Sequence, residues 1–159
     1  MYRKKSEIIG HIQSYHRQVA KLYRDISEKT TDNEMKSLVN ELCEHEESRD
    51  NYLERHRKIA EAMNCWLEFP CERLSAQITE CFRNLELGTE ITMEQLVKIE
   101  MHFDDCLIKL YNILSSENAM SETVANTFYY MLKKTEKEKR ILATMLYNSG
   151  TSLKMAFSE

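Results

Sequence analysis

Glycine and proline are scarce in this chain of 159 residues, which contains three glycines and one proline. Glycine and proline are the residues that most often turn a chain or end a regular element, so the chain has few places where it can reverse direction. This scarcity argues against a fold made of many short elements and favours an all-α fold with long helices.

Long apolar runs are also missing, since none approaches the roughly 20 residues that a membrane-spanning helix needs. The basic N-terminus, Met1–Glu7, is not followed by the apolar segment of a signal peptide, so we expect a cytoplasmic protein. The formal net charge of -4 gives no reason to expect nucleic acid as a partner. The length predicts a single domain, residues 1–159, with one buried core.

No Cys-x-x-Cys motif is present, and the number of cysteines is odd. The five cysteines are Cys43, Cys65, Cys71, Cys81 and Cys106. One interpretation is that they are ordinary buried thiols in a reducing compartment. The other is a zinc or redox role for Cys65, Cys71 and Cys81.

Apolar residues recur at steps of three and four in four long segments, which predicts four long helices. The first spans about residues 4–29. The second starts at the capping-box pair Thr31 and Glu34 and runs to about residue 63. The third spans about 92–115, and the fourth runs from near residue 121 to the stop signal at 148–150. Short breaks predict two antiparallel helical hairpins.

A long crossover, residues 64–90, separates the two hairpins and contains a short amphipathic stretch around Leu74 and Ile78. Trp66, Leu67 and Phe69 cluster before it and belong to no helical stripe. Apolar side chains outside the core commonly mark an interaction surface. We therefore expect a homodimer in which a second subunit or an end of the bundle shields this cluster.

The two hairpins resemble each other in sequence. A shift of 88 positions relates the first and third helices, and a shift of 90 relates the second and fourth. The matched pairs are His16 and Asp104, Tyr23 and Tyr111, Leu42 and Leu132, Glu46 and Glu136, and Arg49 and Lys139. Two such units packed about a pseudo-twofold axis would bring the charged positions together in mid-bundle.

Each of the second and fourth helices carries an acid-x-x-base step, Glu46 with Arg49 and Glu136 with Lys139, at positions that interrupt the apolar stripe. Buried charges need partners, so one interpretation is a buried cluster of charged residues. The other is a pair of solvated ion pairs on helix surfaces.

In this frame the chain resembles the ferritin-like superfamily, and most closely its rubrerythrin-type domains, over roughly residues 5–147. Those domains place a Glu seven residues before a Tyr on the first and third helices, and Glu-x-x-His on the second and fourth, to bind two iron atoms. The resemblance implies an all-α four-helix bundle. The positions that it makes equivalent to the iron ligands are His16, Glu46, Arg49, Asp104, Glu136 and Lys139.

The chain departs from that pattern at Arg49 and Lys139, which stand where the pattern has histidine ligands. An arginine offers no lone pair to a metal, and a lysine would first have to lose its proton. We therefore expect Arg49 and Lys139 to take the place of the metal ions, with no cofactor bound and no catalytic residues. The expected role is structural, binding or regulatory, and more in keeping with a non-enzyme.

Two alternatives stay open. One is an oxidoreductase with iron or another metal in an altered site, for example a displaced site that His45 forms with His16, Glu46 and His102. The other is a helical partner-binding module unrelated to ferritins.

Overall fold

The computed structural model describes residues 2–63, 66–68, 71–83, 85, 91–115 and 122–147. Five helices account for nearly all of them, which confirms the all-helical prediction. The helices are α1 (Lys5–Lys29), α2 (Asn33–Met63), α3 (Cys71–Phe82), α4 (Met93–Ser115) and α5 (Glu122–Tyr147). The short α3 lies in the predicted crossover.

Local signals fix where two of the long helices begin. Asp32 caps α2, because its carboxylate accepts the backbone N–H groups of Glu34 and Met35 at 2.9 and 3.3 Å. The prediction of Thr31 as the capping residue is therefore wrong by one position. At α4, Thr92 and Gln95 form a reciprocal capping box, with bonds of 2.9 and 3.2 Å.

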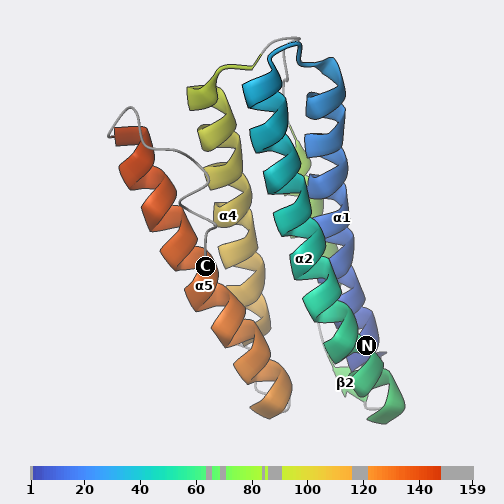
Figure 1. Ribbon diagram of the computed structural model, residues 1–159. Coiled ribbons are helices and arrows are strands. Elements are labelled where there is room, and N and C mark those ends of the chain that lie inside the picture. Colours follow the sequence, from blue (N-terminus) through green and yellow to red (C-terminus); the bar gives the residue numbers. More distant parts are fainter. Residues whose placement is uncertain are drawn as a thin grey trace.

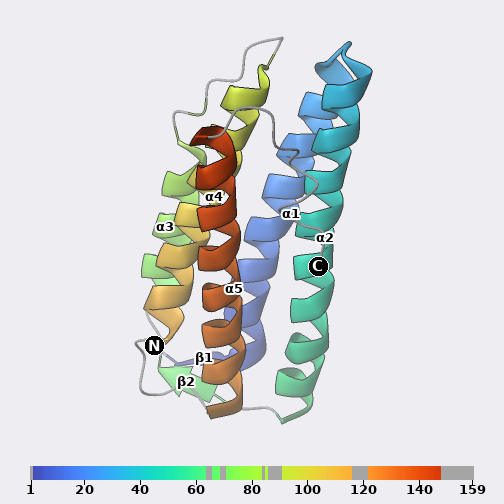
Figure 2. The ribbon, with the colours of Figure 1, turned by 60° about the vertical axis from the view of Figure 1, so that its left-hand side comes forward.

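The four long helices lie side by side in a helical bundle (Figures 1 and 2). In Figure 1, α1 runs upward and α2 returns downward, whereas α4 runs downward and α5 returns upward. The pairs α1–α2 and α4–α5 are therefore antiparallel hairpins, whereas α2 and α4 run in the same direction. Figure 2 shows α3 lying along α4 on the outside of the bundle.

Two three-residue strands, which the sequence did not predict, form a small antiparallel ribbon at one end of the bundle. Strand β1 (Tyr2–Lys4) pairs with β2 (Trp66–Glu68), with Arg3 opposite Leu67. The ribbon ties the N-terminus to the start of the crossover. Phe69 and the side chains of Trp66 and Leu67 lie outside the described part of the chain, so the predicted interaction surface stays a prediction.

The apolar core follows the predicted stripes. In α1 and α4 the buried positions match at the shift of 88, since Val19 and Leu107 are both fully buried, as are Tyr23 and Tyr111. The Tyr15 hydroxyl donates a 2.6 Å hydrogen bond to the backbone carbonyl of Phe103 and so ties α1 to α4 across the core. None of the described helices contains an apolar stretch long enough to cross a bilayer.

Candidate functional site: a buried arginine–carboxylate cluster

A histidine and a glutamate from the first hairpin form the innermost polar contact. His16 on α1 and Glu46 on α2 are 0% and 1% exposed, and His16 Nδ1 lies 2.6 Å from the Glu46 carboxylate. If Nδ1 carries the proton and donates it to the carboxylate, Nε2 is left as an acceptor facing the Tyr111 hydroxyl at 3.4 Å.

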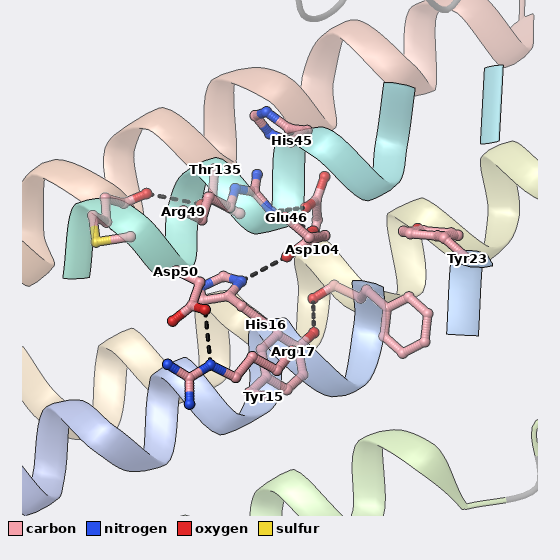
Figure 3. A network of polar contacts seen from close by, with 12 residues as sticks. Tyr15, His16, Arg17, Tyr23, His45, Glu46, Arg49, Asp50, Asp104 and Thr135 are labelled. Carbon is pink, nitrogen blue, oxygen red and sulfur yellow. Dashed lines mark hydrogen bonds and ion pairs between the residues drawn. The ribbon is translucent and has the colours of Figure 1, made fainter. Parts of the chain in front are cut away.

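Arg49, one helical turn after Glu46, reaches carboxylates from three helices. Its guanidinium donates to Glu46 at 2.9 Å and to Glu138 on α5, and it lies 3.6 Å from Asp104 on α4. The last distance allows charge attraction but is too long for a hydrogen bond. The Arg49 side chain is only 10% exposed. Figure 3 shows His16, Glu46, Arg49 and Asp104 converging between the helices.

Glu138 is shared between two side chains of α2. Its carboxylate binds Arg49 and also lies 3.2 Å from His45 Nε2. One turn earlier on α5, Thr135 is 2% exposed, and its hydroxyl donates to the Met131 carbonyl at 2.8 Å. Six residues are called the arginine–carboxylate cluster below. They are Arg49, Glu46, Glu138, the fully buried Asp104, His16 and His45.

A second carboxyl group on α4 lies beside the cluster. Glu100 is 1% exposed and accepts a hydrogen bond from the Tyr23 hydroxyl of α1. Among the described residues, its other oxygen and both oxygens of Asp104 have no hydrogen-bond partner. Since buried polar atoms are nearly always paired, these three oxygens mark the least satisfied part of the core.

Arg49 and the two histidines lower the pKa values of Glu46 and Glu138. Burial alone would raise the pKa of Glu46, but the guanidinium and the His16 hydrogen bond outweigh burial and lower this pKa to about 2. The pKa of Glu138 is lowered against burial by the hydrogen bond from His45 and by the Arg49 charge. Burial disfavours the charge on Arg49, yet its carboxylates raise its pKa well above the usual value.

The two carboxyls of α4 shift the other way. Burial raises the pKa of Asp104, Arg49 opposes the rise and Glu46 adds to it, which leaves a pKa of about 8. Burial, Asp104 and Glu46 together raise the pKa of Glu100 well above its usual value. Burial lowers the pKa of His16 despite its bond to Glu46. The charged centre of the cluster therefore consists of the Glu46 and Glu138 carboxylates with the Arg49 guanidinium, whereas Asp104 and the neighbouring Glu100 hold their protons to a higher pH than usual.

Four of the six predicted cluster positions come together, and two do not. His16, Glu46, Arg49 and Asp104 meet as predicted. The predicted placement of Glu136 and Lys139 in the cluster is wrong, because these side chains are 31% and 33% exposed at the edge of α5. Glu136 lies 3.4 Å from Lys133, and Lys139 pairs with Asp105 of α4.

The error is one of helix phase. The buried residues of α5 match those of α2 at a shift of 89, not 90, so that Thr135 and Glu138 take the positions of Glu46 and Arg49. One residue turns a helix by about 100°, so a one-residue shift moves a side chain from the core to the edge. The acid-x-x-base step is thus buried in α2 alone.

Glu100, Thr135 and Glu138 were missed by the sequence-based prediction. Glu100 had a detectable signal, because it follows the buried Leu96 by four residues and precedes the buried Phe103 by three. Glu138 had none, since residues 133–140 are all polar and give no indication of which side of the helix is buried.

A pocket of about 230 Å³ opens between α1 and α2 beside the cluster. Its lining includes both His16 and Glu46, and its other residues are Arg17, Ala20, Arg24, Glu47 and Asp50. Arg17 pairs with Asp50 at 2.8 Å and Arg24 pairs with Glu47 at 2.8 Å, so both arginines are held by acids of the facing helix. The pocket therefore borders the His16–Glu46 pair.

The residues proposed for an altered metal site do not all come together. His102 donates to the Cys81 carbonyl at 2.8 Å and is not part of the cluster, and the Nε2 contact of His45 is with Glu138 rather than with the His16–Glu46 pair. Within the described ranges, no group of three or more His, Cys, Asp or Glu side chains is arranged to hold a metal ion. Cys65 and the side chain of Cys71 lie outside the described residues, which leaves the zinc prediction for them untested.

The cluster does not fit a di-iron centre. The guanidinium of Arg49 occupies the space between the carboxylates of three helices, and it cannot act as a ligand because it has no free lone pair. Its positive charge is held where a metal would need to supply one. The arrangement can therefore bind a guanidinium and hold protons, and the Arg49 cation fills the place between the carboxyl groups.

The chain matches no protein-family model, no curated protein and no solved structure.

Removing the Arg49 charge should destabilise the fold strongly. Arg49→Met would leave Glu46 and Glu138 buried as carboxylates without their cation. We expect the free energy of unfolding to fall by about 3–5 kcal/mol, the usual cost of breaking a buried ion pair. Chemical denaturation followed by circular dichroism measures this change.

Arg24→Met is the matched control, because Arg24 also pairs with a glutamate of α2 but both side chains are about half exposed, at 54% and 50%. This control should leave the free energy of unfolding almost unchanged. Equal effects of the two substitutions would show that Arg49 is not buried among carboxylates.

The raised pKa of Asp104 predicts a pH dependence with a definite sign. Between the unfolded pKa near 4 and the folded pKa of about 8, the folded chain holds a proton that the unfolded chain releases. Asp104 should therefore make the fold less stable as the pH rises from about 5 to 8. Asp104→Asn should remove this part of the decrease, as measured by urea unfolding across that range.

Asp105→Asn is the control on the same helix, since the Asp105 side chain is 49% exposed. It should keep the pH profile of the unchanged protein. A profile that is the same for Asp104→Asn and the unchanged protein would mean that Asp104 is ionised throughout, contrary to its raised pKa.

Proposed function

We propose that this chain is a ferritin-like four-helix bundle, closest to the rubrerythrin type, whose di-iron site has been replaced by an arginine–carboxylate cluster. In this proposal the protein has a structural, binding or regulatory role and is not an oxidase or peroxidase. The observation that carries the proposal is the guanidinium of Arg49, held between carboxyl groups of α2, α4 and α5.

The order and direction of the helices support the first part of the proposal. Two antiparallel hairpins joined by one long crossover are typical of ferritin-like bundles. The seven-residue spacing from His16 to Tyr23 and from Asp104 to Tyr111 lies on the buried faces of α1 and α4. These are the positions at which the resemblance implies a ligand and a tyrosine.

The charge pattern of the cluster supports the second part. Di-iron carboxylate sites balance several buried acids with two metal ions. Here Arg49 supplies a positive charge to Glu46 and Glu138, and the raised pKa values of the α4 carboxyls reduce the remaining negative charge. A cluster with its own cation has little electrostatic need for a metal.

The two other candidate functions are less well supported. An oxidoreductase with an altered site needs three convergent donors, and His102 points to Cys81 instead of to the cluster. An unrelated partner-binding module would have both Glu46 and Glu136 solvated, and only Glu136, at 31% exposed, fits that description, whereas Glu46 is 1% exposed.

Metal analysis tests the proposal. Protein from cells grown in iron-rich medium should contain far less than one iron, manganese or zinc per chain. Arg49→His is an informative comparison, because it removes the cation and adds an imidazole donor beside Glu46 and Glu138. This variant should bind Co²⁺, detected by its absorption bands, more tightly than the unchanged protein does.

Near-stoichiometric metal in the unchanged protein, with anomalous density between α2 and α4, would contradict the proposal. So would Co²⁺ binding at this position that is as tight with Arg49 as with histidine.

We also propose that the protein is a homodimer. Exposed apolar side chains on two neighbouring helices support this, namely Ile59 on α2 and Tyr129 and Tyr130 on α5, each more than half exposed. One chain has a mass of 18.9 kDa, and light scattering at micromolar concentration should give twice this mass. A clean monomer mass, with Trp66 fluorescence typical of full water exposure, would contradict both the dimer and the shielding of Trp66.

A further inference from the structure

Two cysteine thiols from different helices meet outside the arginine–carboxylate cluster. Cys81 lies near the end of α3 and Cys106 in the middle of α4, and the two lie side by side, because Nε2 of His102 contacts both the Cys81 carbonyl and the Cys106 sulfur. Both are buried, at 1% and 5% exposed. The function proposed above makes no use of either thiol.

Neighbouring contacts hold the two thiols in this position. His102, one turn before Cys106 on α4, donates from Nε2 to the backbone carbonyl of Cys81 at 2.8 Å and lies 3.8 Å from the Cys106 sulfur. Phe82, the residue after Cys81, packs on Phe103 of α4 with ring centroids 5.5 Å apart. The end of α3 is thus fixed to α4 on both sides of the thiol pair.

The two thiols differ in their chemistry. The hydrogen bond from Cys106 lowers the pKa of Cys81 despite burial, and the amide of Gln77, 4.0 Å from the Cys81 sulfur, adds a second donor. The same contact with Cys81, together with burial, raises the pKa of Cys106. Cys81 is therefore the thiol that ionises first, and Cys106 keeps its proton. The thiolate is the nucleophilic form of cysteine.

We propose that Cys81 and Cys106 form a redox-active dithiol that hydrogen peroxide oxidises to a disulfide joining α3 to α4. This inference goes beyond the function proposed above and does not depend on it.

The reaction has two steps. The Cys81 thiolate attacks one oxygen of hydrogen peroxide, the O–O bond breaks, and the products are a Cys81 sulfenic acid and hydroxide, which takes up the proton that Cys81 had released. The Cys106 sulfur then attacks the sulfenic sulfur, the S–S bond forms and water leaves with the Cys106 proton. In total, two thiols lose two hydrogens and one peroxide becomes two water molecules.

Cys43 provides an internal comparison, because it is buried but lacks this arrangement. Its thiol donates to the Ala20 carbonyl at 3.4 Å and lies 3.7 Å from the Glu47 carboxylate. Burial raises the pKa of Cys43, and Glu47 adds to the rise. Among the described residues it faces no second thiol, so it should react more slowly with peroxide than Cys81.

The disulfide would fasten the crossover helix to the bundle. It would close a loop with 24 residues between the two cysteines. Cross-links of this length restrict the unfolded chain and stabilise the fold. The oxidised protein should therefore melt at a temperature higher by about 5 °C or more.

The experiment treats the reduced full-length chain with a small excess of hydrogen peroxide and follows its intact mass. Unchanged protein and Cys43→Ala should each lose two hydrogens, and peptide mapping should find Cys81 linked to Cys106. Alkylation after denaturation should then modify only three of the five cysteines of the unchanged protein, because the other two are joined in the disulfide. In Cys106→Ala, oxidation should stop at the Cys81 sulfenic acid, which dimedone traps.

Peptide mapping of the unchanged protein decides the outcome even if a variant fails to fold. Retention of all five thiols under these conditions would overturn the proposal. It would also be overturned by disulfides that form first between other cysteines or between chains, or by oxidation of Cys43 as fast as that of Cys81.

Discussion

The contact between one guanidinium and three carboxyl groups in mid-bundle constrains most of the structure around it. An arginine stays charged in a protein, and it has donors on two sides of a planar group. Arg49 directs these donors to Glu46 on its own helix and to Glu138 on α5, with Asp104 of α4 beside them. His16 extends the contact to α1 through Glu46. Every long helix is therefore connected to one cation.

This arrangement has an electrostatic cost on α4. One guanidinium cannot neutralise four buried carboxyl groups. Arg49 is hydrogen-bonded to Glu46 and Glu138, and its charge lowers the pKa values of these two acids. Asp104 and Glu100 are left with raised pKa values and with oxygens that have no described hydrogen-bond partner. Removing an ionised acid from such a cluster has an effect different from that of removing a protonated one, so the acids of the cluster are not equivalent.

The parts of this structure that the sequence predicted are those where apolar residues mark the buried face. In α1 and α4, Val19 and Leu107 lie three residues after His16 and Asp104, and they fix the phase of both polar residues. In α5 the run of polar residues 133–140 carries no such mark, and the prediction chose Glu136 in place of Glu138. The ribbon of β1 and β2 was also missed, because three-residue strands depend on pairing between distant segments and have no periodicity of their own.

Two double-mutant cycles test whether Arg49 is held by an acid of α5. The first cycle combines Arg49→Met with Glu138→Gln, and the second combines Arg49→Met with Glu136→Gln. Residues that share a buried ion pair should show a coupling free energy of about 1.5 kcal/mol or more, and residues that do not touch should show less than about 0.5 kcal/mol. We predict strong coupling for Glu138 and none for Glu136. Strong coupling to Glu136, or none to either glutamate, would show that Arg49 is not paired with Glu138.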